Sequence, residues 1–187
     1  VENAVDFLTG RRRERRLEEV TLALAAEMLV SAGIASSNSQ GLALAGDALQ
    51  SGRAAERFAR MVFDLGGPAD FVANHEAHLA RAPVETAALA PCSGFVTGIA
   101  TRDIGLAVVS LGGGRSRPDD TVDPAVGFTR LLPVGSEVRQ GEALALVHAR
   151  RDDEGARAAA SVGAAYTIGD TKTQAGKSVI RRIAPLV

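Results

Sequence analysis

The sequence predicts an α/β protein of the α+β kind, with a helical first half and a second half built on a mainly antiparallel, barrel-sandwich-like sheet. As far as Leu79, apolar residues recur at three- and four-residue spacing, which is the period of amphipathic helices. After Ala82 and Pro83, short apolar runs separated by glycine and proline turns have the composition of strands. We therefore expect two domains, residues 1–80 and residues 81–187.

Five helices are expected in the first half, with glycine and proline at several of the breaks between them. They cover residues 1–8, 17–32, 42–50, 53–65 and 69–79. The second of them is apolar on nearly all sides, so we expect its neighbours to bury it. In the fourth, an apolar stripe is also expected to face the core, and it consists of Phe58, Met61, Val62 and Leu65.

A basic stretch follows the first helix, from Arg11 to Arg16. It is interpreted either as a solvated turn or as an anion site. Because Glu14, Glu18 and Glu19 offset much of its charge, we favour the solvated turn.

The second half is expected to hold four strands and two helices, followed by a loose polar tail. The strands cover residues 84–89, 94–99, 126–132 and 143–147, and the helices cover residues 101–111 and 152–165. Thr101 is expected to cap the first of these helices, with Asp103 near the positive end of its dipole and Gly112 at its exit.

Composition argues against several classes of protein. The chain of 187 residues carries 21 basic and 22 acidic residues, a balance that offers no broad attraction for nucleic acid or an anionic membrane. The longest apolar run, from Val20 to Ile34, is too short to cross a bilayer as a helix. Cys92 is the single cysteine, which excludes an internal disulfide and favours a reducing, cytoplasmic location. We expect Cys92 to be a small core residue.

The most distinctive motif is the run Ser-Leu-Gly-Gly-Gly-Arg-Ser-Arg at residues 110–117. Gly112, Gly113 and Gly114 permit a close approach of the backbone to a partner, and Arg115 and Arg117 are able to pair with an anion. The run follows a helix and does not join a strand to a helix N-terminus, so it is neither a Walker loop nor a dinucleotide fingerprint. It is either a mobile helix exit or a functional loop.

The histidines do not form a recognisable metal site. His75 and His78 lie three residues apart on an expected helix, but no third ligand is apparent, so we expect two exposed helix histidines and no metal. His148 ends an apolar strand, where a structural histidine with satisfied hydrogen bonds is the expectation.

Residues 134–149 have the turn-strand-turn-strand rhythm of biotinyl and lipoyl carrier domains. A carrier must present a lysine on a hairpin, whereas the only lysines here are Lys172 and Lys177, both in the tail. A carrier function is therefore disfavoured. No nucleophile elbow and no cysteine-histidine pair is recognisable either.

Eight stretches share their order and spacing with one known family. They are Val-Glu-Asn-Ala-Val-Asp-Phe-Leu-Thr-Gly at 1–10, Glu-Val-Thr-Leu-Ala-Leu-Ala-Ala-Glu-Met-Leu at 19–29, Ser-Gly-Arg-Ala-Ala-Glu-Arg-Phe at 51–58, Gly-Gly-Pro-Ala-Asp-Phe-Val at 66–72, Gly-Phe-Val at 94–96, Thr-Arg-Asp-Ile-Gly-Leu-Ala-Val-Val-Ser-Leu-Gly-Gly-Gly-Arg at 101–115, Asp-Pro-Ala-Val-Gly-Phe at 123–128 and the segment 135–149. With these stretches the chain resembles the thymidine and pyrimidine nucleoside phosphorylase family, and only the tail beyond about Ala165 looks unlike it.

The resemblance implies a cytoplasmic, homodimeric enzyme without an organic cofactor. Such an enzyme cleaves a pyrimidine deoxynucleoside with inorganic phosphate, giving the free base and a deoxyribose 1-phosphate. A small helical domain and a large α/β domain close around the substrates. This chain resembles the latter part of the large domain, including its C-terminal α+β lobe.

The resemblance assigns no catalytic residue to this chain. In the family, the phosphate-binding Lys-His-Ser-Thr-Gly-Gly segment and the Arg, Ser and Lys that hold the base lie upstream of the region matched here. We therefore expect an inactive fragment of such an enzyme, opening within a helix at Val1. The loop of Gly112, Gly113, Gly114 and Arg115 corresponds to a glycine-rich loop near the domain cleft.

One position is implied for a monovalent cation: Asn3 falls where many relatives have an acidic residue that helps to bind it. Other interpretations stay open beside the enzyme fragment. The chain is alternatively a non-catalytic binding or assembly module derived from this lobe. It is also compatible with part of a broader pyrimidine nucleoside phosphorylase or of an AMP phosphorylase.

Overall fold

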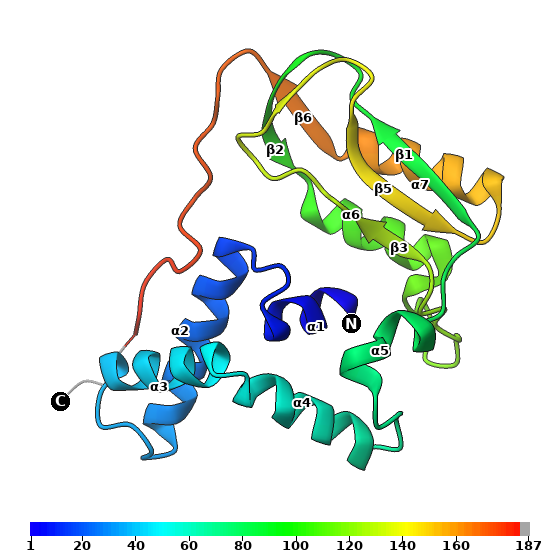
Figure 1. The fold of residues 1–187 in the computed structure, drawn as a ribbon. Helices are drawn as coiled ribbons and strands as arrows, with labels where there is room; N and C mark the ends of the chain where they lie inside the picture. The colour runs from blue at the N-terminus through cyan, green and yellow to red at the C-terminus, as the bar shows by residue number, and fades with distance from the viewer. Residues whose placement is uncertain (184–187) are drawn as a thin grey trace. The chain divides into compact units, whose positions relative to one another are not determined.

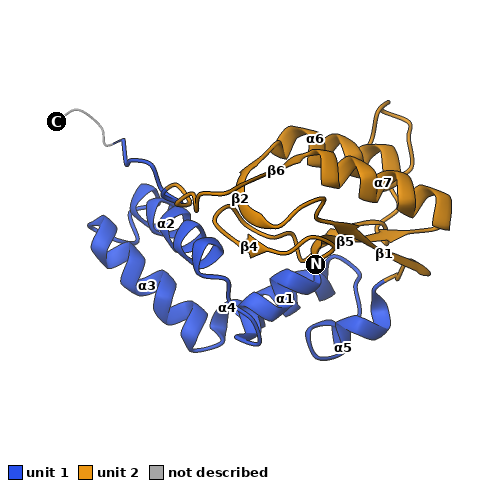
Figure 2. Ribbon diagram, turned by 90° about the horizontal axis from the view of Figure 1, so that it is seen from above, with its two compact units in different colours: residues 1–79, 177–187 blue, residues 80–176 orange. Residues whose placement is uncertain are grey.

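The computed structural model describes residues 1–183, which separate into two compact units (Figure 2). Unit 1 comprises residues 1–79 together with the described residues from Lys177 onward, and unit 2 comprises residues 80–176. Unit 1 contains only helices among its regular elements, whereas unit 2 contains all the strands that the structure describes. Among residues 1–183, no helix combines the length and the apolar character that a membrane span requires.

Each helix predicted in the first half is present in unit 1 (Figure 1). The helices are α1 (Glu2–Thr9), α2 (Arg15–Ser31), α3 (Asn38–Gln50), α4 (Arg53–Asp64) and α5 (Phe71–His78). Helix α1 ends at Gly10, whose left-handed φ of 78° lets its N–H bond the carbonyl of Phe7. Helix α3 begins before the expected Leu42 because Ser37 caps it, its hydroxyl accepting from the N–H of Gln40.

The basic stretch Arg11–Arg16 is part turn and part helix, so its interpretation as a solvated turn is only half right. Glu14 accepts hydrogen bonds from the N–H groups of Arg16 and Leu17 and thereby starts α2 at Arg15. Arg13 is half-buried and donates to the carbonyls of Phe7 and Leu49, which ties the turn to α1 and α3.

Helix α2 is not buried by its neighbours, so this expectation was wrong. Ala26 is its single fully buried residue, while Leu24 and Met28 are 62% and 72% exposed. The helix packs mainly against α3, where Gly41 brings the α3 backbone onto Ala26. The same correction applies to α4, which has no fully buried residue and exposes Met61, and to Leu65, the exposed residue that follows it.

Unit 2 is built on two three-stranded sheets in which every strand pair is antiparallel. One sheet has the order β1 (Val84–Leu89), β5 (Ala143–Ala149), β3 (Gly127–Thr129). The other has the order β4 (Glu137–Val138), β2 (Gly94–Ile99), β6 (Tyr166–Gly169). The α+β prediction is confirmed, and neither sheet closes into a barrel within the part of the chain that the structure describes.

Two helical segments accompany these sheets. Helix α6 (Thr101–Val108) continues into the π-turn η1 (Val109–Gly113), and α7 (Asp152–Ala164) packs against β1 and β5. Gly155 permits this packing, because a Cβ there would lie 2.7 Å from the Thr86 hydroxyl. Asp103 lies in the first turn of α6 as expected, but Thr101 does not cap it, since the helix already starts at Thr101 and no side chain caps it.

The core of unit 2 joins both sheets to α7. Its buried members are Ala88, Ala90, Val96, Val138, Leu144, Ala145, Val162 and Tyr166. The Tyr166 hydroxyl donates to the Leu132 carbonyl at 3.0 Å, and burial raises the pKa of this phenol. Tyr166 opens β6, so the expectation of a loose tail directly after the last helix was wrong for residues 166–169.

Strand β4 lies within residues 134–149, whose turn-strand-turn-strand rhythm indicated a strand before β5, but its bounds were not predicted because two residues carry too little periodicity. Cys92 corrects another expectation, because it is exposed and not a core residue. It lies in the turn between β1 and β2, where the chain leaves one sheet for the other and runs over the surface.

Candidate functional site

The glycine-rich loop, residues 112–115, leaves helix α6 through a turn that glycine alone accommodates without strain. Gly112 has a φ of 95°, in the left-handed region. A Cβ at Gly113 would lie 2.8 Å from Val108 Cγ1 and 3.3 Å from the Val126 carbonyl oxygen. The three glycines of the sequence motif thus let the chain turn back tightly over the end of its own helix.

The segment after the glycines is ordered by short-range hydrogen bonds. The Asp120 carboxylate accepts from the N–H groups of Ser116 and Arg117 at 2.9 and 2.8 Å. The N–H of Asp123 donates to the Gly112 carbonyl at 2.9 Å and closes the base of the loop. The loop is therefore a folded turn and not an unsupported helix exit.

Two cationic side chains lie on this turn, Arg115 and Arg117, and both are exposed. Within residues 1–183 neither guanidinium makes a hydrogen bond or ion pair. Guanidinium groups bind phosphate and carboxylate oxygens through paired N–H donors. The role of Gly112, Gly113, Gly114 and Arg115 at a substrate stays a prediction.

An ion pair at the base of the loop escaped the sequence analysis. Arg150 Nε and Nη2 donate to the two carboxylate oxygens of Asp123 at 2.6 and 2.9 Å. These two bonds form a fork, the Asp123–Arg150 fork. Together with the N–H of Ala125, the fork lowers the pKa of Asp123 to about 2. The same fork raises the pKa of Arg150. The two residues lie far apart in the sequence, so no local pattern announces the pair.

The paired histidines of α5 have separate partners. His75 is buried, with 1% exposure, so the expectation of an exposed residue was wrong. Its Nδ1 lies 3.2 Å from Arg11 Nη2, whereas His78 Nε2 lies 2.9 Å from a carboxylate oxygen of Asp70. Bonds from Asn74 and then His78 lower the pKa of Asp70. Each histidine therefore has a structural partner.

His148 meets the expectation of a structural histidine. Its Nε2 lies 2.7 Å from the Thr129 hydroxyl on β3, and its Nδ1 lies 3.5 Å from a carboxylate oxygen of Glu85 on β1. It thus links both neighbours of β5.

The position considered for a cation, Asn3, is an exposed residue in the first turn of α1. Across residues 1–183, no group of three or more His, Cys, Asp or Glu side chains is arranged to hold a metal ion. An amide on an exposed helix turn offers a single side-chain carbonyl ligand, which is a small part of any cation shell.

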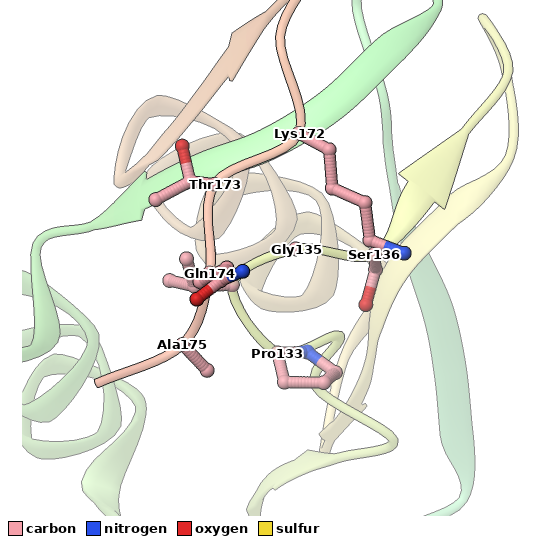
Figure 3. Close-up of a pocket in the computed structure, with 8 residues that line it drawn as sticks. Pro133, Gly135, Ser136, Lys172, Thr173, Gln174 and Ala175 are labelled. Carbon is pink, nitrogen blue, oxygen red and sulfur yellow. The ribbon is translucent and has the colours of Figure 1, made fainter. Parts of the chain in front are cut away.

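An open pocket of about 480 Å³ lies elsewhere in unit 2 (Figure 3). Residues 133–136 form one wall and residues 172–175 the other, and Figure 3 shows Lys172 extending toward Ser136. The walls meet closely at Gly135, where a Cβ would lie 2.7 Å from the Thr173 carbonyl oxygen. Lys172 is the one ionisable side chain among the residues that line this pocket.

Comparison with known proteins identifies the class of this fold: residues 95–169, which include the glycine-rich loop and the Asp123–Arg150 pair, match the pyrimidine nucleoside phosphorylase C-terminal domain. The chain belongs to the thymidine and pyrimidine nucleoside phosphorylase family and matches the C-terminal part of its members.

Three relatives, each named thymidine phosphorylase, illustrate the match. The chain is 65% identical over 185 residues to the protein of Mesorhizobium japonicum, covering 99% of this chain and 42% of the relative. It is 46% identical over 181 residues to that of Agrobacterium fabrum, covering 97% and 41%. It is 48% identical over 168 residues to that of Burkholderia orbicola, covering 90% and 38%.

The chain thus spans about two fifths of the length of these relatives. The Mesorhizobium japonicum alignment takes in almost the whole tail, so the expectation that the residues beyond Ala165 are unlike the family was wrong.

Proposed function

We propose that this chain is the C-terminal part of a thymidine phosphorylase, which cleaves thymidine with inorganic phosphate to thymine and 2-deoxyribose 1-phosphate. The observation that carries the proposal is the identity of 65% along 99% of the chain to a protein named thymidine phosphorylase. Such identity, continuous through both units, favours a shared activity over an assembly module that kept one lobe alone. The reaction makes the chain part of a pentosyltransferase of nucleoside metabolism.

The glycine-rich loop is the segment of unit 2 that we propose takes part in this reaction. Phosphate is an oxyanion, and Arg115 is an exposed guanidinium without a side-chain partner among the described residues. We expect the loop to approach the substrates when the cleft closes and to add positive charge beside phosphate or the developing sugar phosphate. Groups that bind the base and the main phosphate contacts are assigned to upstream segments of the complete enzyme, and none to this chain.

The remaining properties of the complete enzyme follow the same proposal. It acts as a homodimer in the cytoplasm, takes phosphate as co-substrate and uses no organic cofactor. Asn3 provides only one side-chain oxygen. A monovalent cation bound to the complete protein therefore takes most of its ligands from other residues.

The decisive experiment compares this chain with a longer polypeptide that adds the upstream part present in its relatives. Thymine release from thymidine and phosphate is followed for both. We expect turnover from the longer polypeptide and none from residues 1–187 alone. Turnover by the shorter chain would contradict the assignment of the chemistry to upstream residues, and a well-folded, inactive long form would favour the assembly module.

Substrate range is tested on the same long polypeptide with uridine and AMP in place of thymidine. A preference for thymidine supports the proposal. Efficient phosphorolysis of AMP would replace it with a nucleotide phosphorylase, and comparable use of uridine would broaden it to pyrimidine nucleosides in general.

A further inference from the structure

We infer that Asp123 and Arg150 are a positioning pair that fixes the glycine-rich loop to the central strand of its sheet. Asp123 makes hydrogen bonds at the base of the loop with both its backbone and its side chain. Its N–H donates to the Gly112 carbonyl at 2.9 Å, so it holds the place where the loop leaves η1. Its carboxylate accepts from Ala125 N–H at 3.0 Å, so it also shapes the return toward β3.

Arg150 attaches Asp123, and with it the base of the loop, to the end of a buried strand. It directly follows β5, the middle strand of the β1-β5-β3 sheet, and the preceding Ala149 is fully buried. The guanidinium holds both oxygens of Asp123, through Nε at 2.6 Å and Nη2 at 2.9 Å. Two parallel bonds fix the orientation of the carboxylate as well as its distance.

The tip of the loop has no comparable attachment. The bonds from Ser116 and Arg117 end on Asp120 of the same turn, so they hold its shape but not its place in the unit. The Gly112–Asp123 bond joins the two ends of the loop to each other. The Asp123–Arg150 fork is therefore the described side-chain interaction that links this closed turn to the sheet.

The functional consequence rests on the proposed phosphorolysis. A cation contributes most to binding an anion when its position is set before binding, because little conformational freedom is then lost. The fork sets the position from which Arg115 approaches an oxyanion. Asp123 and Arg150 act through Arg115 and do not themselves touch substrate.

Limited trypsin digestion of residues 1–187 tests the positioning directly. The reporter is cleavage after Arg115, since Pro118 follows Arg117 and protects that second site. We expect D123A and R150A each to be cleaved roughly two- to fivefold faster than the unmodified chain, the range for loss of one partly exposed ion pair. The reversed pair D123R/R150D should return most of the way to the original rate.

D153A is the matched control, because Asp153 also pairs with arginines, Arg151 and Arg157, but has no described hydrogen bond or ion pair with residues 112–123. Its cleavage rate after Arg115 should stay unchanged. Far-ultraviolet circular dichroism checks the fold of every variant, and D123N, which keeps an acceptor for Ala125, replaces D123A if that variant unfolds. Original cleavage rates in the folded single variants, or a reversed pair as labile as either of them, would overturn the inference.

Phosphorolysis by the longer polypeptide provides the functional readout. D123A and R150A should raise the KM for phosphate about two- to fivefold with a smaller change in kcat, and the reversed pair should restore it. Unchanged KM in both variants overturns the link to anion binding. If the unmodified long polypeptide is inactive, the proposed function fails, whereas the digestion still decides whether the fork holds the loop.

Discussion

His75 Nδ1 lies 3.2 Å from Arg11 Nη2, a contact that joins helix α5 to the turn that follows α1. Since a guanidinium only donates, the imidazole nitrogen is the acceptor of this hydrogen bond. The ring is buried and lies edge-on to Phe71 at a centroid distance of 6.5 Å. Arg11 also reaches Asp6, with 3.2 Å between Nε and a carboxylate oxygen.

Replacing His75 with alanine should therefore destabilise unit 1 by about 1–3 kcal/mol, because the change leaves a void beside Phe71 and removes the acceptor of Arg11. The control is His78→Ala on the same helix, whose partner Asp70 is exposed, with an expected cost below about 1 kcal/mol. Urea unfolding followed by circular dichroism measures both. Equal effects would show that the buried contact of His75 adds nothing.

Stability should depend on the charge of Asp123 in a defined pH range. Its pKa is lowered from 3.8 to about 2, first by the Arg150 side chain and then by the N–H of Ala125. A lowered pKa in the folded protein gives stability that is fully present above pH 3.8 and is lost as the pH falls toward about 2.

The measurement is the difference in unfolding free energy between the unmodified chain and D123N at a series of pH values. This difference should be constant near neutral pH and shrink below pH 3.8. D119N is the control, because Asp119 is an exposed residue of the segment between Arg115 and Asp123. A difference that stays the same at low pH would contradict the contribution of the ionised carboxylate.

Two glycines of helix α3 should respond in opposite directions to substitution by alanine. At Gly41 a Cβ would lie 2.8 Å from the Ala26 carbonyl oxygen and 3.1 Å from the Ala26 Cβ, so Gly41→Ala should cost about 1–3 kcal/mol by forcing α2 and α3 apart. Gly46 has open space, and Gly46→Ala should stabilise the helix by about 0.5–1 kcal/mol. Thermal unfolding of both variants gives the comparison, and a shift in the same direction would refute the close packing of these helices.

An exposed leucine of α2 should tolerate a change that a buried leucine does not. Leu24 is 62% exposed, so Leu24→Ala should alter the stability of this chain by no more than about 0.5 kcal/mol. Leu49 on α3 is 5% exposed, and Leu49→Ala should cost about 2–5 kcal/mol. Urea unfolding of the two variants distinguishes them. A large loss at Leu24 would restore the original expectation that α2 is a buried helix.

Several features were predictable because they depend on neighbouring residues. The three- and four-residue apolar period located the helices of unit 1, and Gly10 marked the end of α1 through its left-handed conformation. Strands β1 and β2 were predicted with their observed bounds, because both are compact apolar runs between turn residues. The motif at Gly112 to Arg115 was visible for the same reason, since three successive glycines constrain the backbone locally.

The sequence by itself determined the order and type of most elements, the α+β class and the resemblance to the phosphorylase family. Only the tertiary structure decided that His75 is buried, that Leu24 and Cys92 are exposed, and that Asp123 meets Arg150. An apolar or titratable side chain is buried only if another segment covers it, and that segment is distant in the chain. Local periodicity states which side chains share a face, while packing between distant segments determines what each face contacts.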